Sequence, residues 1–170
     1  MDAVQRGDPW LPADFIHPTQ VDLASGHHMR LLAERDVDID YPAVMSSQPR
    51  LWSIFGAAWG WPEPTMSYEH DQADLARHER ESNAHLSFAY AVLDAAETEL
   101  LGCVYVDPPA RIGADADICW WVVDKAVGSP LDTCLAGAVP QWITTSWPFT
   151  APRVLGRDLS WDEWLTLPTV

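Results

Sequence analysis

The chain has 170 residues, of which 48% are hydrophobic, and its 25 acidic and 10 basic residues give a formal net charge of −15. Its 10 tryptophans and its apolar content exclude an unfolded acidic chain, because disorder accompanies few aromatic residues and low hydrophobicity. The basic residues are too few and too scattered for a nucleic-acid or anionic-membrane binder, which attracts phosphates with basic patches.

Length and cysteine usage indicate the setting of the protein. A chain of 170 residues suits one domain. No apolar run approaches the roughly 20 residues needed to span a bilayer, and the first residues lack the apolar stretch of a secretion signal. The 3 cysteines contain no CxxC pair, which favours a reducing compartment. We therefore expect a cytoplasmic protein.

Residues 1–26 are predicted to be irregular, because prolines and Gly26 interrupt them. We expect them to form an arm that packs on a single domain of residues 27–170. The apolar residues that would hold the arm in place are Trp10, Leu11, Phe15 and Ile16.

The first half of the domain is predicted to be mainly helical. Pro42 and Pro49 are expected to interrupt the first helical region, because proline lacks a backbone donor. Ser67 is a good N-cap for the polar helix that follows. In chain order, the predicted elements are a strand at 28–32, helical stretches within 36–55, a loop rich in Gly and Pro at 59–64 and a helix at 67–84.

The second half is predicted to contain consecutive strands and then a helix. Runs of aromatic and branched residues separated by turn residues are typical of antiparallel strands. Ser129 as N-cap and Pro130 at the first position predict a helix start. The predicted elements are strands at 86–93, 99–106 and 115–123, a helix from 130, a short strand at 153–156 and a helical turn at 160–165. This order indicates an α+β fold with a central, mostly antiparallel sheet flanked by helices.

Two segments carry a resemblance to a known family. One is Leu101-Gly-Cys-Val-Tyr-Val106, and the other is residues 114–124 followed by Lys125-x-x-Gly128-Ser129-Pro130. With the order of elements over residues 28–147, they resemble the GNAT (GCN5-related N-acetyltransferase) superfamily. The chain looks like a divergent, C-terminally shortened GNAT-like domain, because the residues after Trp147 are too few for the family's usual strand, helix and two further strands.

The resemblance implies acetyl-CoA or another acyl-CoA as co-substrate, held at the start of the helix at 130. Unpaired N–H groups and the positive end of the helix dipole favour a pyrophosphate there. Pro130 departs from the family pattern because it has no N–H group, and a Gly-Ser-Pro helix start without a cofactor role is the alternative. The residues implied to contact the cofactor are Val122, Val123, Lys125, Gly128 and Ser129.

The resemblance also implies catalytic positions on the strands. Asp117 matches the place of a carboxylate that often serves as the base in the family. The family's usual tyrosine acid is missing, because no tyrosine follows Tyr105, so Tyr105 is the candidate replacement. The alternatives are that Asp117 is an exposed acid at a strand start and that Tyr105 is a half-buried strand aromatic.

A stripe of histidines and acids follows one face of the helix at 67–84. We take His78 as a third catalytic candidate, since histidine can relay protons near neutral pH. A solvated helix face is the alternative, and we expect no metal. The stripe consists of His70, Asp74, His78, Glu81 and His85.

Trp59 and Trp61, in the loop before this helix, are expected to line the acceptor pocket, together with Asp107 and Trp120. Aromatic faces suit a cationic ligand, and the acidic surface favours one. We therefore expect an acyltransferase acting on a small-molecule amine, with a homodimer as one possible assembly. Two alternatives stay open: a hydrolase, lyase or cyclase that no longer uses acyl-CoA, and a non-catalytic binding protein.

Overall fold

The computed structural model describes residues 9–170 and contains one six-stranded sheet. Its strands lie side by side in sequence order, and all neighbours are antiparallel except β5 and β6, which are parallel. The strands are β1 (Gln20–Asp22), β2 (His28–Leu31), β3 (Phe88–Leu93), β4 (Leu100–Asp107), β5 (Ala116–Val122) and β6 (Pro152–Val154). The predicted α+β fold with a mostly antiparallel sheet is confirmed.

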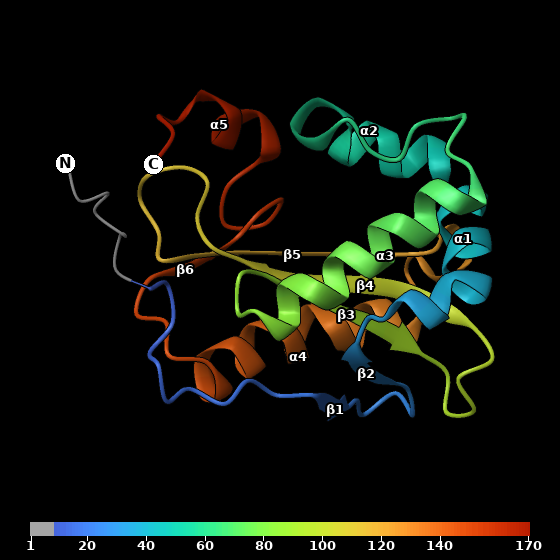
Figure 1. Cartoon of the computed structure of the whole chain (residues 1–170), viewed down its shortest axis with the longest axis horizontal. Helices are drawn as coiled ribbons and strands as arrows, with labels where there is room; N and C mark the ends of the chain where they lie inside the picture. Colours follow the sequence, from blue (N-terminus) through green and yellow to red (C-terminus); the bar gives the residue numbers. More distant parts are fainter. Residues whose placement is uncertain (1–8) are drawn as a thin grey trace, which may run out of the picture.

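Helices cover both faces of this sheet. Figure 1 shows α3 crossing the strands on the face that also carries α1 and α2. On the opposite face, Trp142 of α4 packs edge-on against Tyr90 of β3, with ring centroids 5.0 Å apart. The helices are α1 (Val37–Ser46), α2 (Gln48–Trp59), α3 (Tyr68–Asn83), α4 (Pro130–Ser146) and α5 (Trp161–Thr166).

Local sequence signals explain where most helices begin. The hydroxyl oxygens of Ser67 and Ser129 accept the N–H groups of His70 and Asp132, as the N-cap prediction required. The expected break at Pro42 is wrong, because α1 continues through that residue. The backbone bond that Pro42 cannot make would involve the carbonyl of Asp38, an exposed residue that water can reach.

The N-terminal region is more regular than its prolines suggest. Residues 20–22 form β1, which pairs with β2 through Val21 and Met29. The Trp10 indole donates to the backbone oxygen of Asp115 at 2.8 Å, which ties this region to the domain as expected. Ile16 is 88% exposed, so the contact expected from it is wrong. The first eight residues of the predicted arm lie outside the described residues.

The short pairing of β6 leaves part of β5 unpaired. β6 faces β5 only from Ala116 to Ile118, and the two segments then separate. Within residues 9–170, no strand pairs with the second half of β5 on that side.

In the same part of the chain, no helix is long and apolar enough to cross a membrane.

Candidate active site

A cavity of about 410 Å³ lies between α3, the end of α2 and the face of the sheet that they cover. Its size is in the range of small-molecule sites. It contains five of the residues predicted to form the site: Trp59, Trp61, His78, Tyr105 and Asp107. The other lining residues include Asp40, Asp71, Asp74, Arg77 and Trp121.

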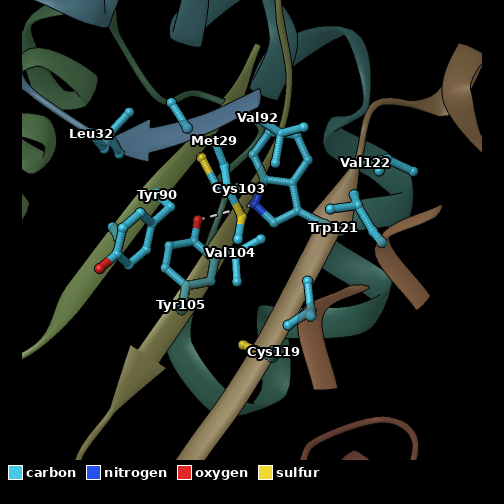
Figure 2. Packing of buried hydrophobic residues seen from close by; sticks show 14 of the residues in the cluster. Met29, Leu32, Tyr90, Val92, Cys103, Val104, Tyr105, Cys119, Trp121 and Val122 are labelled. Atoms are coloured by element: carbon cyan, nitrogen blue, oxygen red, sulfur yellow. Dashed lines mark hydrogen bonds between the residues drawn. The ribbon is translucent and has the colours of Figure 1, made fainter. Parts of the chain in front are cut away.

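The register of β4 and β5 brings Tyr105 and Trp121 to the same face. Residues paired across an antiparallel sheet point to one side, and the pairs here are Tyr105 with Cys119 and Cys103 with Trp121. The Trp121 indole donates to the Tyr105 phenol oxygen at 3.0 Å (Figure 2). Burial raises the pKa of Tyr105 well above its usual value. The phenol therefore stays neutral and retains its proton as a hydrogen-bond donor.

His78 projects from α3 toward the same point. Its ring centroid lies 5.9 Å from that of Tyr105. Burial, assisted by the neighbouring Arg77 guanidinium, lowers the pKa of His78 to about 4. The imidazole is therefore neutral near pH 7 and able to accept a hydrogen bond or a proton.

The predicted stripe on α3 separates into two parts. His70, Asp74 and His78 lie on one face of α3, as helical spacing predicted, and this part of the face lines the cavity. Glu81 instead accepts from Arg77 at 3.0 Å, and His85 lies beyond the helix at 3.1 Å from His17. Within residues 9–170, no group of three or more His, Cys, Asp and Glu side chains is arranged to hold a metal ion.

Asp107 and Asp117 are opposite one another at the end of β4 and the start of β5. Burial and the negative charge of Asp117 raise the pKa of Asp107 to about 7. Asp117 does not line the cavity. Its carboxylate accepts from Arg153 at 2.5 Å and from the Trp164 indole at 3.3 Å, so its oxygens are engaged by protein groups.

Aromatic rings form the outer wall of the cavity. Trp59 lies edge-on to Tyr105 and stacks on Phe55, with centroid distances of 5.6 and 4.8 Å. The ring of Trp161 in α5 lies edge-on to that of Trp59, with the centroids 5.4 Å apart. Trp120 was predicted to line the pocket, but it does not. Successive side chains of a strand point to opposite faces, so Trp120 lies on the other face of the sheet from Trp121. There the guanidinium of Arg157 stacks on it, 4.3 Å from its ring centroid.

Sequence reasoning missed two buried acids of the lining, Asp40 and Asp71. A signal for both was present in the helical spacing. Asp40 lies three residues after Val37 and four before Val44, which are buried, and Asp71 lies four before the buried Leu75. A carboxyl group on the apolar face of a helix is unusual and marks a candidate site.

The unpaired half of β5 fits the amide-rich arm of an acyl-CoA. Ile118 accepts from Leu155 on the β6 side, and Val123 donates to Leu101 on the β4 side. Because backbone groups alternate along a strand, those of Trp120 and Val122 point to the open side. Arg50 already donates to the Val122 oxygen. The Trp120 N–H and C=O groups and the Val122 N–H group are thus positioned to pair with amide groups.

The start of α4 is less suited to a diphosphate than the family pattern implies. The Gly128 N–H donates to the carboxylate of Asp132 at 2.8 Å, and Pro130 has no N–H group. The Lys125 ammonium pairs with Glu99. A diphosphate that bound here would have to displace the Asp132 carboxylate, which carries the same sign of charge.

No protein-family model matches the chain, and no curated protein matches it in sequence. Solved structures do match. A probable acetyltransferase is 14% identical, with 79% of this chain and 72% of that chain covered and a TM-score of 0.62. RimL, a ribosomal L7/L12 alpha-N-protein acetyltransferase in complex with coenzyme A, is 14% identical, with 75% and 70% covered and a TM-score of 0.60.

A third match is the Salmonella typhimurium acetyltransferase that modifies the N-terminal serine of ribosomal protein L7/L12. It is 12% identical, with 75% of this chain and 70% of that chain covered and a TM-score of 0.59. The aligned region covers 65% of apo RimL, slightly less than two thirds of its length. At these identities the likeness concerns the fold: the chain has the fold of GNAT acetyltransferases.

Proposed function

Starting from this GNAT fold, we propose that the chain is an acyltransferase that moves an acetyl or other acyl group from acyl-CoA to an amine of a small molecule. The observation that carries the proposal is the meeting of Asp107, Tyr105 and His78 in one cavity between α3 and the sheet. Fold likeness supports the donor, and the cavity of about 410 Å³ supports a small acceptor.

When bound, acyl-CoA supplies the thioester that carries the acyl group. Trp120 and Val122 would pair with its amide arm through backbone groups, and Ser129 at the start of α4 would contact its diphosphate once the Asp132 carboxylate is displaced. An ammonium group cannot attack a carbonyl until it loses a proton. Asp107, whose pKa is about 7, would accept that proton, directly or through the neutral imidazole of His78.

Tyr105 would assist the departure of the sulfur. As the new C–N bond forms and the C–S bond breaks, negative charge develops on sulfur. The Trp121 indole occupies a lone pair of Tyr105, so the phenol proton is oriented away from that bond and available to the sulfur. Asp117 is then a positioning residue, because its charge keeps the pKa of Asp107 high.

Two further expectations accompany this function. A reducing cytoplasm suits the three cysteines, which are free in the structure. A homodimer stays a prediction.

Release of free CoA thiol tests the proposal. Purified protein is incubated with acetyl-CoA and a panel of small primary amines. We expect amine-dependent thiol release whose rate rises with pH through about 7, because Asp107 must be deprotonated. Asp107→Asn should lower kcat by about 100-fold or more and abolish the rise, since a general base contributes about 10²–10⁴-fold.

Asp22→Asn is the matched control, because Asp22 is an exposed acid on the edge strand β1, three strands away from β4 and Asp107. It should leave the rate and the pH profile unchanged. Equal rates for the Asp107→Asn variant and the wild type would remove Asp107 from the mechanism. No thiol release with any amine would contradict acyl transfer to this class.

A further inference from the structure

Two carboxyl groups meet at the inner wall of the cavity. Asp40 of α1 is 3% exposed and Asp71 of α3 is 2% exposed, and both line the cavity. Oδ2 of Asp71 is buried, and no donor in residues 9–170 forms a hydrogen bond with it. An unsatisfied buried oxygen of this kind costs free energy unless a ligand or a shared proton satisfies it.

No lysine or arginine side chain of the described residues forms an ion pair with either carboxyl group, and the basic side chain that faces Asp71 from the same cavity is His70. The guanidinium of the nearby Arg77 forms ion pairs with Asp74 and Glu81, at 3.3 and 3.0 Å. The guanidinium of Arg30 pairs with Asp36 at 2.9 Å. Burial and the charge of Asp71 raise the pKa of Asp40 well above its usual value, whereas burial and the charge of Asp74 raise that of Asp71 to about 6. Asp40 therefore keeps its proton near neutral pH, and the pair retains about one negative charge.

The surroundings of the pair select the kind of cation. Trp59, Trp61 and Trp121 line the same cavity, and aromatic faces attract organic ammonium groups. A bound metal would need further ligands, and residues 9–170 contain no arrangement of three or more such side chains. An ammonium group can donate an N–H to the unpaired oxygen of Asp71, and its positive charge is attracted to the aromatic faces.

We propose that Asp40 and Asp71 form a cation subsite that binds a second, non-reacting ammonium group of the acceptor. This inference rests on the proposed function and names the substrate class of the same cavity: molecules with two amino groups. Asp71 and His78 are seven residues apart on α3, which is two turns, or about 10 Å along the axis. One amino group would lie near His78, Tyr105 and Asp107 while the other remains protonated beside Asp40 and Asp71.

Binding of diamines in the absence of acyl-CoA tests the subsite. The probes are α,ω-diaminoalkanes of three to eight carbons, and n-alkylamines of equal length are the matched ligands, titrated calorimetrically at pH 7. We expect the best diamine to bind at least about tenfold more tightly than its monoamine, which corresponds to about 1.4 kcal/mol. The variant Asp40→Asn/Asp71→Asn should lose this preference.

The control variant is Asp38→Asn/Glu69→Gln. It removes two acids from the same two helices on their exposed sides, and it should bind diamines as the wild type does. Thermal unfolding and circular dichroism establish that each variant is folded. If the double cavity variant fails to fold, Asp71→Asn alone is measured, with the same expected direction of change.

Equal affinity for diamines and monoamines, or a preference that survives the cavity variant, would overturn the subsite. Stabilisation by Mg²⁺ that depends on Asp40 and Asp71 would overturn it in favour of a metal. Acyl transfer to monoamines without any preference for diamines would overturn the subsite but leave the proposed function intact. Diamine binding without transfer would support the subsite and count against the proposed function.

Discussion

Asp107 and Asp117 are paired across β4 and β5, yet their surroundings differ. Arg153 and Trp164 donate to Asp117, whereas Asp107 faces the cavity and forms no ion pair within residues 9–170. Burial beside the charge of Asp117 therefore raises the pKa of Asp107. Two residues of one type thus have different roles, and Asp107, rather than the predicted Asp117, is positioned to exchange a proton with a ligand in the cavity.

The raised pKa of Asp71 also predicts how stability depends on pH. Between about pH 4 and pH 6 the folded chain keeps the proton that the unfolded chain has lost, so the free energy of unfolding should fall as pH rises. Asp71→Asn should flatten this part of the profile and increase stability at pH 7, by on the order of 3 kcal/mol, since the pKa is raised from 3.8 to about 6 and one pKa unit is about 1.4 kcal/mol.

Urea denaturation at intervals of half a pH unit measures this effect. The other ionisable side chains that face Asp71 are Asp40, Asp74 and His70, and they are present in both proteins. Profiles for Asp71→Asn and the wild type that differ by a constant would show that Asp71 does not bind the proton.

The sequence predicts the type of these residues better than their partners. Strand alternation places Tyr105 and Asp107 on one face and helical spacing places His78 on one face of its helix, but only the family resemblance indicated that these two faces meet. The partner of Asp117 could not be predicted, since Arg153 is 36 residues away on a strand of only three residues. Likewise, nothing in the local sequence indicated that Asp40 would meet Asp71.

Among the elements, those with clear start signals or long apolar runs were predictable. The caps at Ser67 and Ser129 and the buried strands β3, β4 and β5 follow from residue type. β1 was not predictable, because its three residues are stabilised by pairing with β2 rather than by their own preferences. The place of Trp120 on the face opposite the cavity depends on the register of β5.

The start of α4 makes a prediction about cofactor affinity. Asp132→Ala removes the carboxylate that holds the Gly128 N–H and that would repel a phosphate. We expect acetyl-CoA to bind about three- to tenfold more tightly, since a charge at a helix start contributes about 0.3–1 kcal/mol and a free amide adds to it. Calorimetric titration of the folded variant measures the change.

Asp162→Ala is the matched control, because Asp162 is an exposed acid in the first turn of α5. It should not alter the affinity. Unchanged or weaker binding by Asp132→Ala would show that the diphosphate does not use this helix start.

At the scale of the whole molecule, the last 20 residues join segments that are distant in sequence. Arg111 donates to the Leu167 oxygen at 2.5 Å, and the Val170 N–H donates to Ala110 at 3.2 Å. Figure 1 shows α5 beside α2, where Trp161 contacts Trp59. The C-terminal segment thereby supports Trp59, one of the aromatic residues that line the cavity.

Arg153 is the charged residue that anchors this segment to the sheet. Its side chain is 11% exposed and pairs with Asp117, which is 6% exposed. Arg153→Ala should lower the free energy of unfolding by about 3–5 kcal/mol, because it removes the positive charge that pairs with a buried carboxylate. Adding Asp117→Asn should recover part of the loss, and Arg35→Ala, at an exposed arginine, should cost little.

Chemical denaturation of the four proteins measures these differences. A loss for Arg153→Ala no larger than that for Arg35→Ala would mean that the ion pair does not hold the segment in place.

Binding of acetyl-CoA tests the central claim most directly, because acyl transfer from this donor requires that the fold still accommodate it. The measurement is a calorimetric titration of the wild-type chain with acetyl-CoA, repeated as thermal unfolding with millimolar ligand. We predict saturable one-to-one binding and a higher Tm, since a ligand at 100 times its Kd adds about 2.7 kcal/mol of stability. No heat of binding and no change in Tm would contradict the acyltransferase.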